Sequence, residues 1–425
     1  MHNLHIICKN IFKKFIFIHF KQLTKAKNRR IVMHIKNSRK ERTYAMKKLL
    51  TLLLSLTVAS SCVFAAACAD ADTEASAYPQ NYGAESYKKL QYIDKTLPDR
   101  DCFNGENFKL TQKWIHFTLT EAGYSSDDIV YQEVPITKYV LKTDDLSQKF
   151  SAAKSYETDG KSYVKNKRDY IESEDGTYTK ATVVSENIVV TKQGNSDKQI
   201  IIGMHYDGTG TGDNGSGVAL GLTTAEMFYN TETEFTLKFV FFTAEEYGLY
   251  GSSFYAENMT EEEKANTLYM INMDSLVCGD YTYLYGGVQN NEQKTVLKTE
   301  AYDNAMAVAQ KLGLSFKSNP WTWGHLAPEN YSGDNPDYAS PSTGDWSDHA
   351  PFAEAGVTYL YFEATNWEIP DYTGYGETYM VGMIMNTEND NLAYIEHYFP
   401  DRPVKHLTKF SALLNGLLTQ TEWNY

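Results

Sequence analysis

The chain has 425 residues, 42% of them hydrophobic and 14% aromatic, and carries a formal net charge of −14 at pH 7, a length that allows one large domain or two small ones. Basic residues gather in positions 1–45, which hold 12 Lys or Arg and one acidic residue, Glu41. Beyond position 68 there are 26 basic and 53 acidic residues, which argues against nucleic acid as a partner, because binding to phosphates needs a basic surface.

Residues 46–68 have the pattern of an export signal. Two lysines follow Met46, and an apolar stretch of signal-peptide length then ends in small residues, which favours a signal peptide over a membrane span. Because a signal begins at its own methionine, we interpret residues 1–45 as an over-called N-terminal extension. Cys68 could be lipidated as the first residue of a lipoprotein, or cleavage could follow one of the alanines before it. In both cases we expect an extracytoplasmic product, secreted or lipid-anchored at the cell surface, with the anchor as its only membrane contact.

Loss of the leader also removes two of the five cysteines, Cys8 and Cys62. Apart from Cys68, the mature chain then keeps Cys102 and Cys278. A disulfide between these two fits an oxidising compartment, but two cysteines do not imply one.

The first part of the mature chain predicts a linker, a helix pair and strands. Residues 69–85 are small, acidic and polar, as in a tether. From residue 86 to about residue 123, apolar residues recur at helical spacing on both sides of the turn PDRDCFNGEN, which predicts two helices. Residues 129–190 predict strands, with an excursion or hairpin at 139–178. We find no internal repeat, and we interpret residues 86–425 as one domain.

Three short apolar runs follow, at 200–204, 237–243 and 268–273. Continuous apolar runs of this length are typical of strands that are buried on both faces. Between the first two runs, a glycine-rich loop carries Asp213 and leads into a helix that is predicted to begin near Ser216. Each run is followed by residues of types that bind metals. These are His205 and Asp207 after the first run, Glu245 and Glu246 after the second, and Asp274 after the third.

Metal ligands at the ends of neighbouring strands lie at one edge of an α/β sheet, where such folds place their sites. His205 and Asp207 are two residues apart on an extended chain, so they share a face. One of them could bind a cation while the other holds the imidazole from behind. Imidazole and carboxylate groups suit zinc. A cation held there could make a nucleophile available at neutral pH and place positive charge against a developing oxyanion.

The motifs HYD, DNGSG, AEEYGLYGS, NMD and SDHAPF occur in this order along the chain. Through them the sequence resembles the zinc aminopeptidase family of clan MH, of the aminopeptidase S and aminopeptidase Y type, to which glutaminyl cyclase is related. The resemblance covers roughly residues 85–420.

The resemblance implies specific roles for these residues. Asp213 is expected to bridge two zinc ions, and Glu245 to be the general base that takes a proton from the attacking water. Asp207 is expected to hold the imidazole of His205 from the side that faces away from the metal. The implied zinc ligands are His205, Asp213 and Asp274 for the first ion and Asp213 and Glu246 for the second.

One ligand position departs from the family pattern. The second zinc takes a histidine from a C-terminal HTxxD segment in the family, and the matching stretch here, MNTENDN, has Asn386 in its place. An amide is a poor zinc ligand beside an imidazole, so the second site is expected to be weak, empty or completed by another residue. His349 of SDHAPF is the nearest alternative as the fifth ligand, and Asp348 is expected in hydrogen bonds behind the metals. His325 and His397 are more remote candidates.

The C-terminal part predicts a helix at 296–312, a strand at VTYLYFEA and a closing helix at 404–423. The irregular stretch at 316–345 is rich in aromatic residues. In a long loop beside a site, such residues suggest either a pocket wall or ordinary packing of the loop. The candidates for the substrate pocket are Trp321, Trp323 and Tyr331.

The predicted fold is a one-domain α/β protein with a mixed, mainly parallel central sheet and helices on both faces. The predicted function is an exported zinc-dependent aminopeptidase that hydrolyses N-terminal peptide bonds with metal-activated water, with two zinc ions and a weak second site. Two alternatives stay open. A glutaminyl-cyclase-like acyltransferase shares the fold and needs one zinc, and a peptide-binding pseudoenzyme would explain Asn386. The AEEYGLYGS context favours a peptidase over a cyclase, and the other intact site positions favour an enzyme.

Overall fold

The computed structural model describes residues 80–102, 105–141, 178–290, 292–321, 339–369 and 374–423. All of them fall within one compact unit, Asp72–Tyr425. The predicted leader with Cys68 and most of the predicted excursion at 139–178 lie outside the described residues. Three candidate site residues from the long loop, Trp323, His325 and Tyr331, also lie outside the described residues.

The described strands are β1 (Ile129–Leu141), β2 (Tyr178–Lys192), β3 (Gln199–His205), β4 (Thr236–Phe242), β5 (Thr267–Met273), β6 (Tyr281–Gly286), β7 (Val288–Asn290), β8 (Thr295–Leu297) and β9 (Tyr359–Thr365). Seven of them form one sheet in the order β1-β2-β4-β3-β5-β9-β6, and β7 pairs with β8 in a separate ribbon. The four middle strands, β4, β3, β5 and β9, are parallel, whereas β1, β2 and β6 are antiparallel to their neighbours. The prediction of a mixed sheet with a mainly parallel centre is confirmed.

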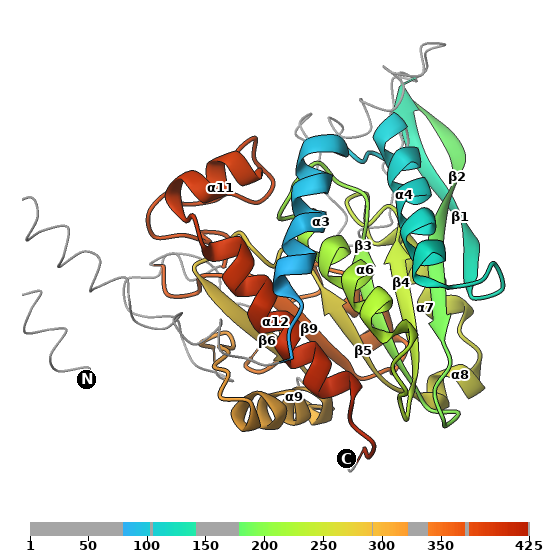
Figure 1. The fold of residues 1–425 in the computed structure, drawn as a ribbon, viewed down its shortest axis with the longest axis vertical. Helices are drawn as coiled ribbons and strands as arrows, with labels where there is room; N and C mark the ends of the chain where they lie inside the picture. Colours follow the sequence, from blue (N-terminus) through green and yellow to red (C-terminus); the bar gives the residue numbers. More distant parts are fainter. Residues whose placement is uncertain are drawn as a thin grey trace, which may run out of the picture. The chain divides into compact units, whose positions relative to one another are not determined.

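The described helices are α3 (Gly83–Thr96), α4 (Glu106–Ala122), α6 (Gly215–Tyr229), α7 (Tyr250–Asn258), α8 (Glu261–Asn266), α9 (Glu300–Lys311), α10 (His349–Glu354), α11 (Leu392–Tyr398) and α12 (Arg402–Leu418). Helices α3, α6 and α12 lie side by side over one face of the sheet (Figure 1). The largest apolar cluster joins them, with α4 and α9, to the strands. A second cluster joins α7 and α10 to the strands.

The continuous apolar runs in the sequence are explained by burial on both sides of the sheet. Every residue of β3 is buried. Ile200 and Ile202 belong to the cluster under α3, α6 and α12, whereas Ile201, between them, belongs to the cluster under α7 and α10. Because successive side chains of a strand point to opposite faces, helices cover both faces of the sheet, as predicted.

Helix α3 begins at Gly83, inside the stretch at 69–85 that was predicted as a linker. The helix begins there because its first turn packs against α12. Tyr82 is buried, and its backbone N–H donates to Ser411 Oγ at 3.2 Å. A Cβ atom on Gly83 would overlap the backbone of Thr408. The polar composition of the linker gives no sign of this contact.

Helix α9 begins at Glu300, later than the predicted start at residue 296. Residues 295–297 instead pair with β7 as strand β8. Thr299 precedes the helix, and its hydroxyl donates to Asp303 Oδ2 at 2.7 Å. The apolar residues before Thr299 extend the helical pattern in the sequence although they belong to the ribbon.

Two further findings concern membrane spans and cysteines within the described residues. Among the described helices, none is both long and apolar enough to cross a bilayer. Cys102 and Cys278 are not joined in a disulfide. Cys278 Sγ instead donates to Asp390 Oδ1 at 3.6 Å.

The contact between α3 and α12 predicts a stability effect at Gly83. Gly83→Ala should lower the free energy of unfolding by about 1–3 kcal/mol, because the added methyl group overpacks the interface with Thr408. Denaturant unfolding measures the change. The exposed neighbour Ala84 provides the control, since Ala84→Ser should leave the midpoint almost unchanged. Equal midpoints for Gly83→Ala and the unmodified chain would contradict the close packing.

Candidate active site

The parallel register of the middle strands brings the predicted site residues to one edge of the sheet. His205 is the last residue of β3 and pairs with Phe242, the last residue of β4. Glu245 and Glu246 follow β4, and Asp274 follows β5, the other neighbour of β3. Because these strands are parallel, their carboxyl ends meet where α/β folds place ligands.

Three buried side chains, His205, Asp213 and Asp274, converge at this edge. His205 Nε2 lies 3.1 Å from Asp213 Oδ1 and 3.3 Å from Asp274 Oδ1. One ligand atom from each residue lies within 4.8 Å of the other two. Asp274 Oδ2 accepts a hydrogen bond of 2.7 Å from Ser347 Oγ, which fixes the orientation of the carboxylate. A single ion could therefore contact all three residues.

Asp207 faces the other ring nitrogen of His205. Its Oδ1 atom lies 3.6 Å from His205 Nδ1 and accepts a hydrogen bond of 3.1 Å from the backbone N–H of Glu245. The first distance is longer than an ordinary hydrogen bond. Asp207 thus lies behind the imidazole, the position that the resemblance implies, and it also anchors the start of the segment that carries Glu245.

Arg100 holds the backbone of the loop that follows β3. Its side chain is buried, and it donates from Nε to Tyr206 O at 3.1 Å and from Nη2 to Gly210 O at 2.7 Å. Its backbone N–H donates to Gly208 O at 2.8 Å. Burial lowers the pKa of Arg100, and the charge of Asp207 opposes this effect. A role for Arg100 was not predicted from the sequence, because this residue lies in the turn between two helices, far from the motifs.

Negative charge is in excess in the buried cluster. Burial alone would lower the pKa of His205, but the surrounding carboxylates, led by Asp274, hold this pKa well above its ordinary value. Burial raises the pKa of Asp213 well above its ordinary value, and Asp274 and Glu246 add to the rise. Burial also raises the pKa of Glu245 well above its ordinary value. Further positive charge is needed to keep these carboxylates ionised together.

The residues fit a zinc centre. Imidazole nitrogen and carboxylate oxygen atoms are common zinc ligands, and His205, Asp213 and Asp274 present one such atom each within a small volume. A divalent cation would also supply the missing positive charge and bring the carboxylate pKa values down. Both the chemistry of the donors and the charge balance are therefore those of a metal site.

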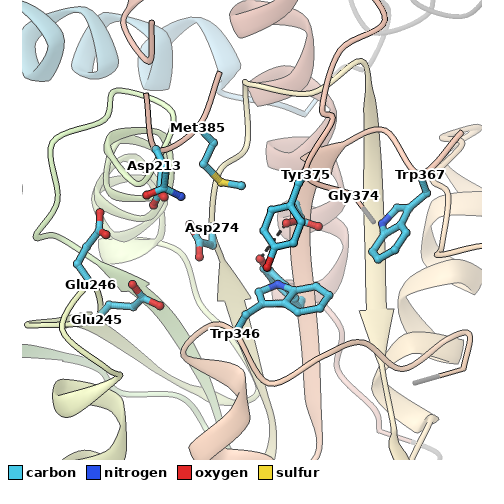
Figure 2. Close-up of a pocket in the computed structure, with 12 residues that line it drawn as sticks. Asp213, Glu245, Glu246, Asp274, Trp346, Trp367, Gly374, Tyr375 and Met385 are labelled. Carbon is cyan, nitrogen blue, oxygen red and sulfur yellow. Dashed lines mark hydrogen bonds between the residues drawn. The ribbon is translucent and has the colours of Figure 1, made fainter. Parts of the chain in front are cut away.

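A cavity of about 190 Å³ opens beside the carboxylates. We call its two sides the acidic end and the aromatic end (Figure 2). The acidic end consists of Asp213, Glu245, Glu246 and Asp274. The aromatic end consists of Trp346, Tyr361, Glu363, Trp367 and Tyr375. Gly374, Met385 and Asn386 complete the lining.

Asn386 faces the same cavity as the acidic end. Its φ angle is 60°, in the left-handed region that asparagine tolerates better than most residues. The backbone N–H groups of Ile384 and Met385 donate to Glu377 Oε2 at 2.7 Å and 2.9 Å. Glu377 therefore fixes the segment that places Asn386 beside the carboxylates.

Asp390 joins this segment to the loop that carries Asp213. Its carboxylate accepts hydrogen bonds from the backbone N–H groups of Gly212 at 2.6 Å and Asp213 at 2.9 Å. Burial raises the pKa of Asp390 to about 6, and these two bonds oppose the rise. Asp390 occupies the aspartate position of the HTxxD pattern, so the contact supports the alignment that sets Asn386 at the histidine position. A role for Asp390 was not predicted from the sequence, although the motif contained it.

His349, the alternative fifth ligand, does not line the cavity. Its Nε2 atom lies 3.0 Å from Gly344 O, and its ring stacks on Tyr361 with the ring centroids 4.8 Å apart. Asp348 is buried behind the site, and burial raises its pKa to about 7 against the opposing charge of His205. Neither of its carboxylate oxygens accepts a hydrogen bond from the described residues, so the expected hydrogen bonds of Asp348 are not observed. This arrangement puts His349 in the wall behind the aromatic end and not among the metal-binding groups.

The described aromatic residues at the cavity differ from those predicted. Trp321 is buried in a cluster with Tyr361 and Trp367 and does not line the cavity, so its placement does not support a direct role in the pocket. His397 is exposed on α11, outside the cavity. The residues that do line the aromatic end had local signals, because Trp346 directly precedes SDHAPF and Tyr361 lies in the predicted strand VTYLYFEA.

Comparison with known proteins agrees with this geometry. The model of peptidase family M28 matches residues 187–398. The alkaline phosphatase isozyme conversion protein of Escherichia coli K12 is 29% identical over 254 residues, which cover 56% of this chain and 68% of that protein. Aminopeptidase Y of Saccharomyces cerevisiae is 32% identical over 115 residues, which cover 26% of this chain and 21% of that protein.

A solved structure shows the same fold. The aminopeptidase from Aneurinibacillus sp. strain AM-1 matches with a TM-score of 0.56 and 16% sequence identity, over 83% of this chain and 98% of that one. The matched family region contains the ends of β3, β4 and β5 and the segment with Asn386. Residues 187–398 belong to peptidase family M28, and this region carries the site motifs that resemble those of zinc aminopeptidases.

Proposed function

We propose that this protein is an exported aminopeptidase that holds two zinc ions and removes the N-terminal residue of peptides. One observation carries the proposal. His205, Asp213 and Asp274 converge within 4.8 Å, and they share one cavity edge with Glu245 and Glu246. A bound zinc ion polarises the scissile carbonyl group and makes a nucleophile available at neutral pH.

The residues would divide between two ions. His205 and Asp274 are the ligands proposed for the first ion, Glu246 is the ligand proposed for the second, and Asp213 would contact both. Asn386 faces the cavity where the family has a histidine. Because an amide binds zinc more weakly than an imidazole, the second ion should be held less tightly than the first.

Glu245 is the proposed general base. It lines the cavity beside Asp274, and the hydrogen bond from its backbone N–H to Asp207 fixes its position. Glutamate is a common general base in enzymes when its carboxylate lies within reach of the proton that it takes. Glu245 would take a proton from the attacking water and pass it to the leaving amine.

The size of the cavity supports removal of one residue at a time. At about 190 Å³ it is smaller than the roughly 300–1,000 Å³ of pockets for drug-sized ligands. Such a cavity suits one terminal side chain better than several residues of a peptide.

The two adjacent glutamates should respond in opposite ways to substitution. Glu245→Gln should reduce kcat by at least about 100-fold, the usual size of an acid–base effect, with metal content near that of the unmodified protein. Glu246→Gln should instead lower the metal content. Hydrolysis of aminoacyl p-nitroanilides and metal analysis by mass spectrometry measure the two quantities. Loss of metal in Glu245→Gln would make Glu245 a ligand and break the assignment.

The same substrates separate the alternative functions. A pseudoenzyme would bind peptides and hydrolyse none of them, even when loaded with zinc. A cyclase would release ammonia from N-terminal glutamine and leave the p-nitroanilides intact. Either result would overturn the proposed function.

Asn386 provides a gain-of-ligand experiment. The unmodified protein should bind one zinc tightly and one weakly, with activity that rises as zinc is added. Asn386→His should raise the occupancy toward two ions per chain and increase turnover, because an imidazole restores a strong ligand. Metal titration followed by desalting and metal analysis measures the change.

His349→Ala is the matched control, because His349 contacts Gly344 and Tyr361 and not the cavity. It should keep the metal content of the unmodified protein. If His349→Ala loses an ion while Asn386→His changes neither occupancy nor rate, His349 is the missing ligand and the alignment of the C-terminal segment is wrong.

Export rests on the lysine pair and apolar stretch after Met46. A chain expressed from Met46 in a bacterial host should be processed near residue 68 and recovered outside the cytoplasm, as N-terminal sequencing can show. Processing that globomycin blocks would assign lipidation to Cys68. A mature protein that still carries residues 1–45 would refute the proposed leader.

A further inference from the structure

The aromatic end of the cavity contains a carboxylate that the proposed chemistry does not use. Glu363 lies on β9, lines the cavity, and is 6% exposed. The four carboxylates of the acidic end have roles at the metals or as the base, and two divalent cations would balance their charge. Glu363 has no such assignment. Among the described residues that line the cavity, none is lysine or arginine.

Tyrosine hydroxyl groups hold Glu363 in place. Its Oε2 atom accepts a hydrogen bond of 2.7 Å from Tyr285, and its Oε1 atom accepts one of 3.3 Å from Tyr361. Trp367 Nε1 donates to the same Tyr285 hydroxyl at 2.8 Å. Each carboxylate oxygen can accept a further hydrogen bond. The carboxylate is therefore both oriented and able to receive a donor from the cavity.

Aromatic faces surround the space next to this carboxylate. Figure 2 shows Trp346, Tyr375 and Trp367 on the side of the cavity away from Glu245 and Glu246. The ring centroids of Trp346 and Trp367 are 6.4 Å apart. The faces of tryptophan and tyrosine rings attract cations, most strongly where water is excluded. A carboxylate among such rings is a combination that suits a positively charged group on an apolar stem.

We propose that Glu363 and the aromatic residues around it form a subsite for a cationic side chain, so that the enzyme prefers peptides with an N-terminal lysine or arginine. This inference rests on the proposed function. The methylene stem of either side chain would contact the rings of Trp346 and Tyr375, and its charged end would donate to Glu363.

An apolar side chain would fit this end less well. It could contact the rings, but it would separate the carboxylate from water and leave it with only the two neutral tyrosine donors. A buried charge is costly unless an opposite charge pairs with it. The cation supplies that charge, which favours the ionised form of Glu363. The carboxylate is therefore the main feature that discriminates between the two kinds of substrate, and the ring faces add to the discrimination because they attract a cation.

The test compares lysine with norleucine, which has the straight apolar chain but no ammonium group. With the zinc-loaded full chain, kcat/KM for lysine p-nitroanilide should exceed that for norleucine p-nitroanilide by about tenfold or more, the size of one charge-assisted hydrogen bond. Calorimetric titration with lysinamide and norleucinamide should show the same order of affinity without relying on turnover.

Glu363→Gln should reduce the ratio of the two kcat/KM values by about tenfold, because the amide keeps the shape of the side chain and loses its charge. Tyr375→Leu, at a position that is 58% exposed and tolerant of change, should reduce the same ratio by removing an aromatic face. Glu368→Gln is the matched control. Glu368 is exposed, does not line the cavity, and pairs with Lys317, so this variant should keep both rates and their ratio.

The outcomes separate this inference from the proposed function. If leucine and norleucine substrates are cleaved and the lysine substrate is not preferred, the subsite proposal fails and the aminopeptidase stands. If Glu363→Gln slows both substrates equally, the carboxylate serves the α-ammonium group or the fold, and the proposal also fails. If no aminoacyl substrate is cleaved but lysinamide still binds more tightly than norleucinamide, the subsite stands without the activity.

Discussion

The crowding of carboxylates around one imidazole is the constraint on which the site depends. Asp213 and Asp274 both lie within 3.3 Å of His205 Nε2, and Glu245 and Glu246 face the same cavity. Such a cluster is unfavourable in a protein interior unless positive charge compensates it. The fold brings these groups together because three parallel strands end at the same edge of the sheet, and it leaves the compensation to a ligand.

Backbone groups control how the cluster is held. Asp390 accepts two N–H groups from the loop of Asp213, and Glu377 accepts two from the segment of Asn386. Both carboxylates are buried and lie far along the chain from the first motif. The place of residue 386 at the cavity is therefore set by hydrogen bonds between distant segments as well as by the identity of its own side chain. Replacing the side chain of residue 386 would change the atom that faces the cavity, whereas the backbone hydrogen bonds accepted by Asp390 and Glu377 would remain.

Local patterns in the sequence predicted the buried strands and the residues at their ends. The run at 200–204 predicted β3 within one residue at each end, because a strand buried on both faces is continuously apolar. The residues at the strand ends came together as the rule for α/β sheets predicts. The start of α3 at Gly83 was missed because it depends on packing against α12, which lies at the other end of the chain.

The aromatic end was harder to predict because it also depends on contacts between segments that are distant in the sequence. Trp346, Tyr361 and Tyr375 come from separate segments, and only the sheet brings them to one cavity. Trp321 lies in the aromatic-rich stretch that suggested a pocket wall, yet it is buried behind the wall. Composition can indicate that a loop is rich in aromatic residues, but the direction of each ring depends on contacts between segments.

Arg100 gives the loop after β3 a property that the metal ligands alone would not provide. Its guanidinium group donates to backbone carbonyl groups at residues 206 and 210 and leaves the carboxylates of the cluster to other partners. The loop is thus shaped by a cation that is covalently part of the chain. An ion that binds at the cluster would therefore meet a loop whose backbone Arg100 already holds, and binding would not have to order it.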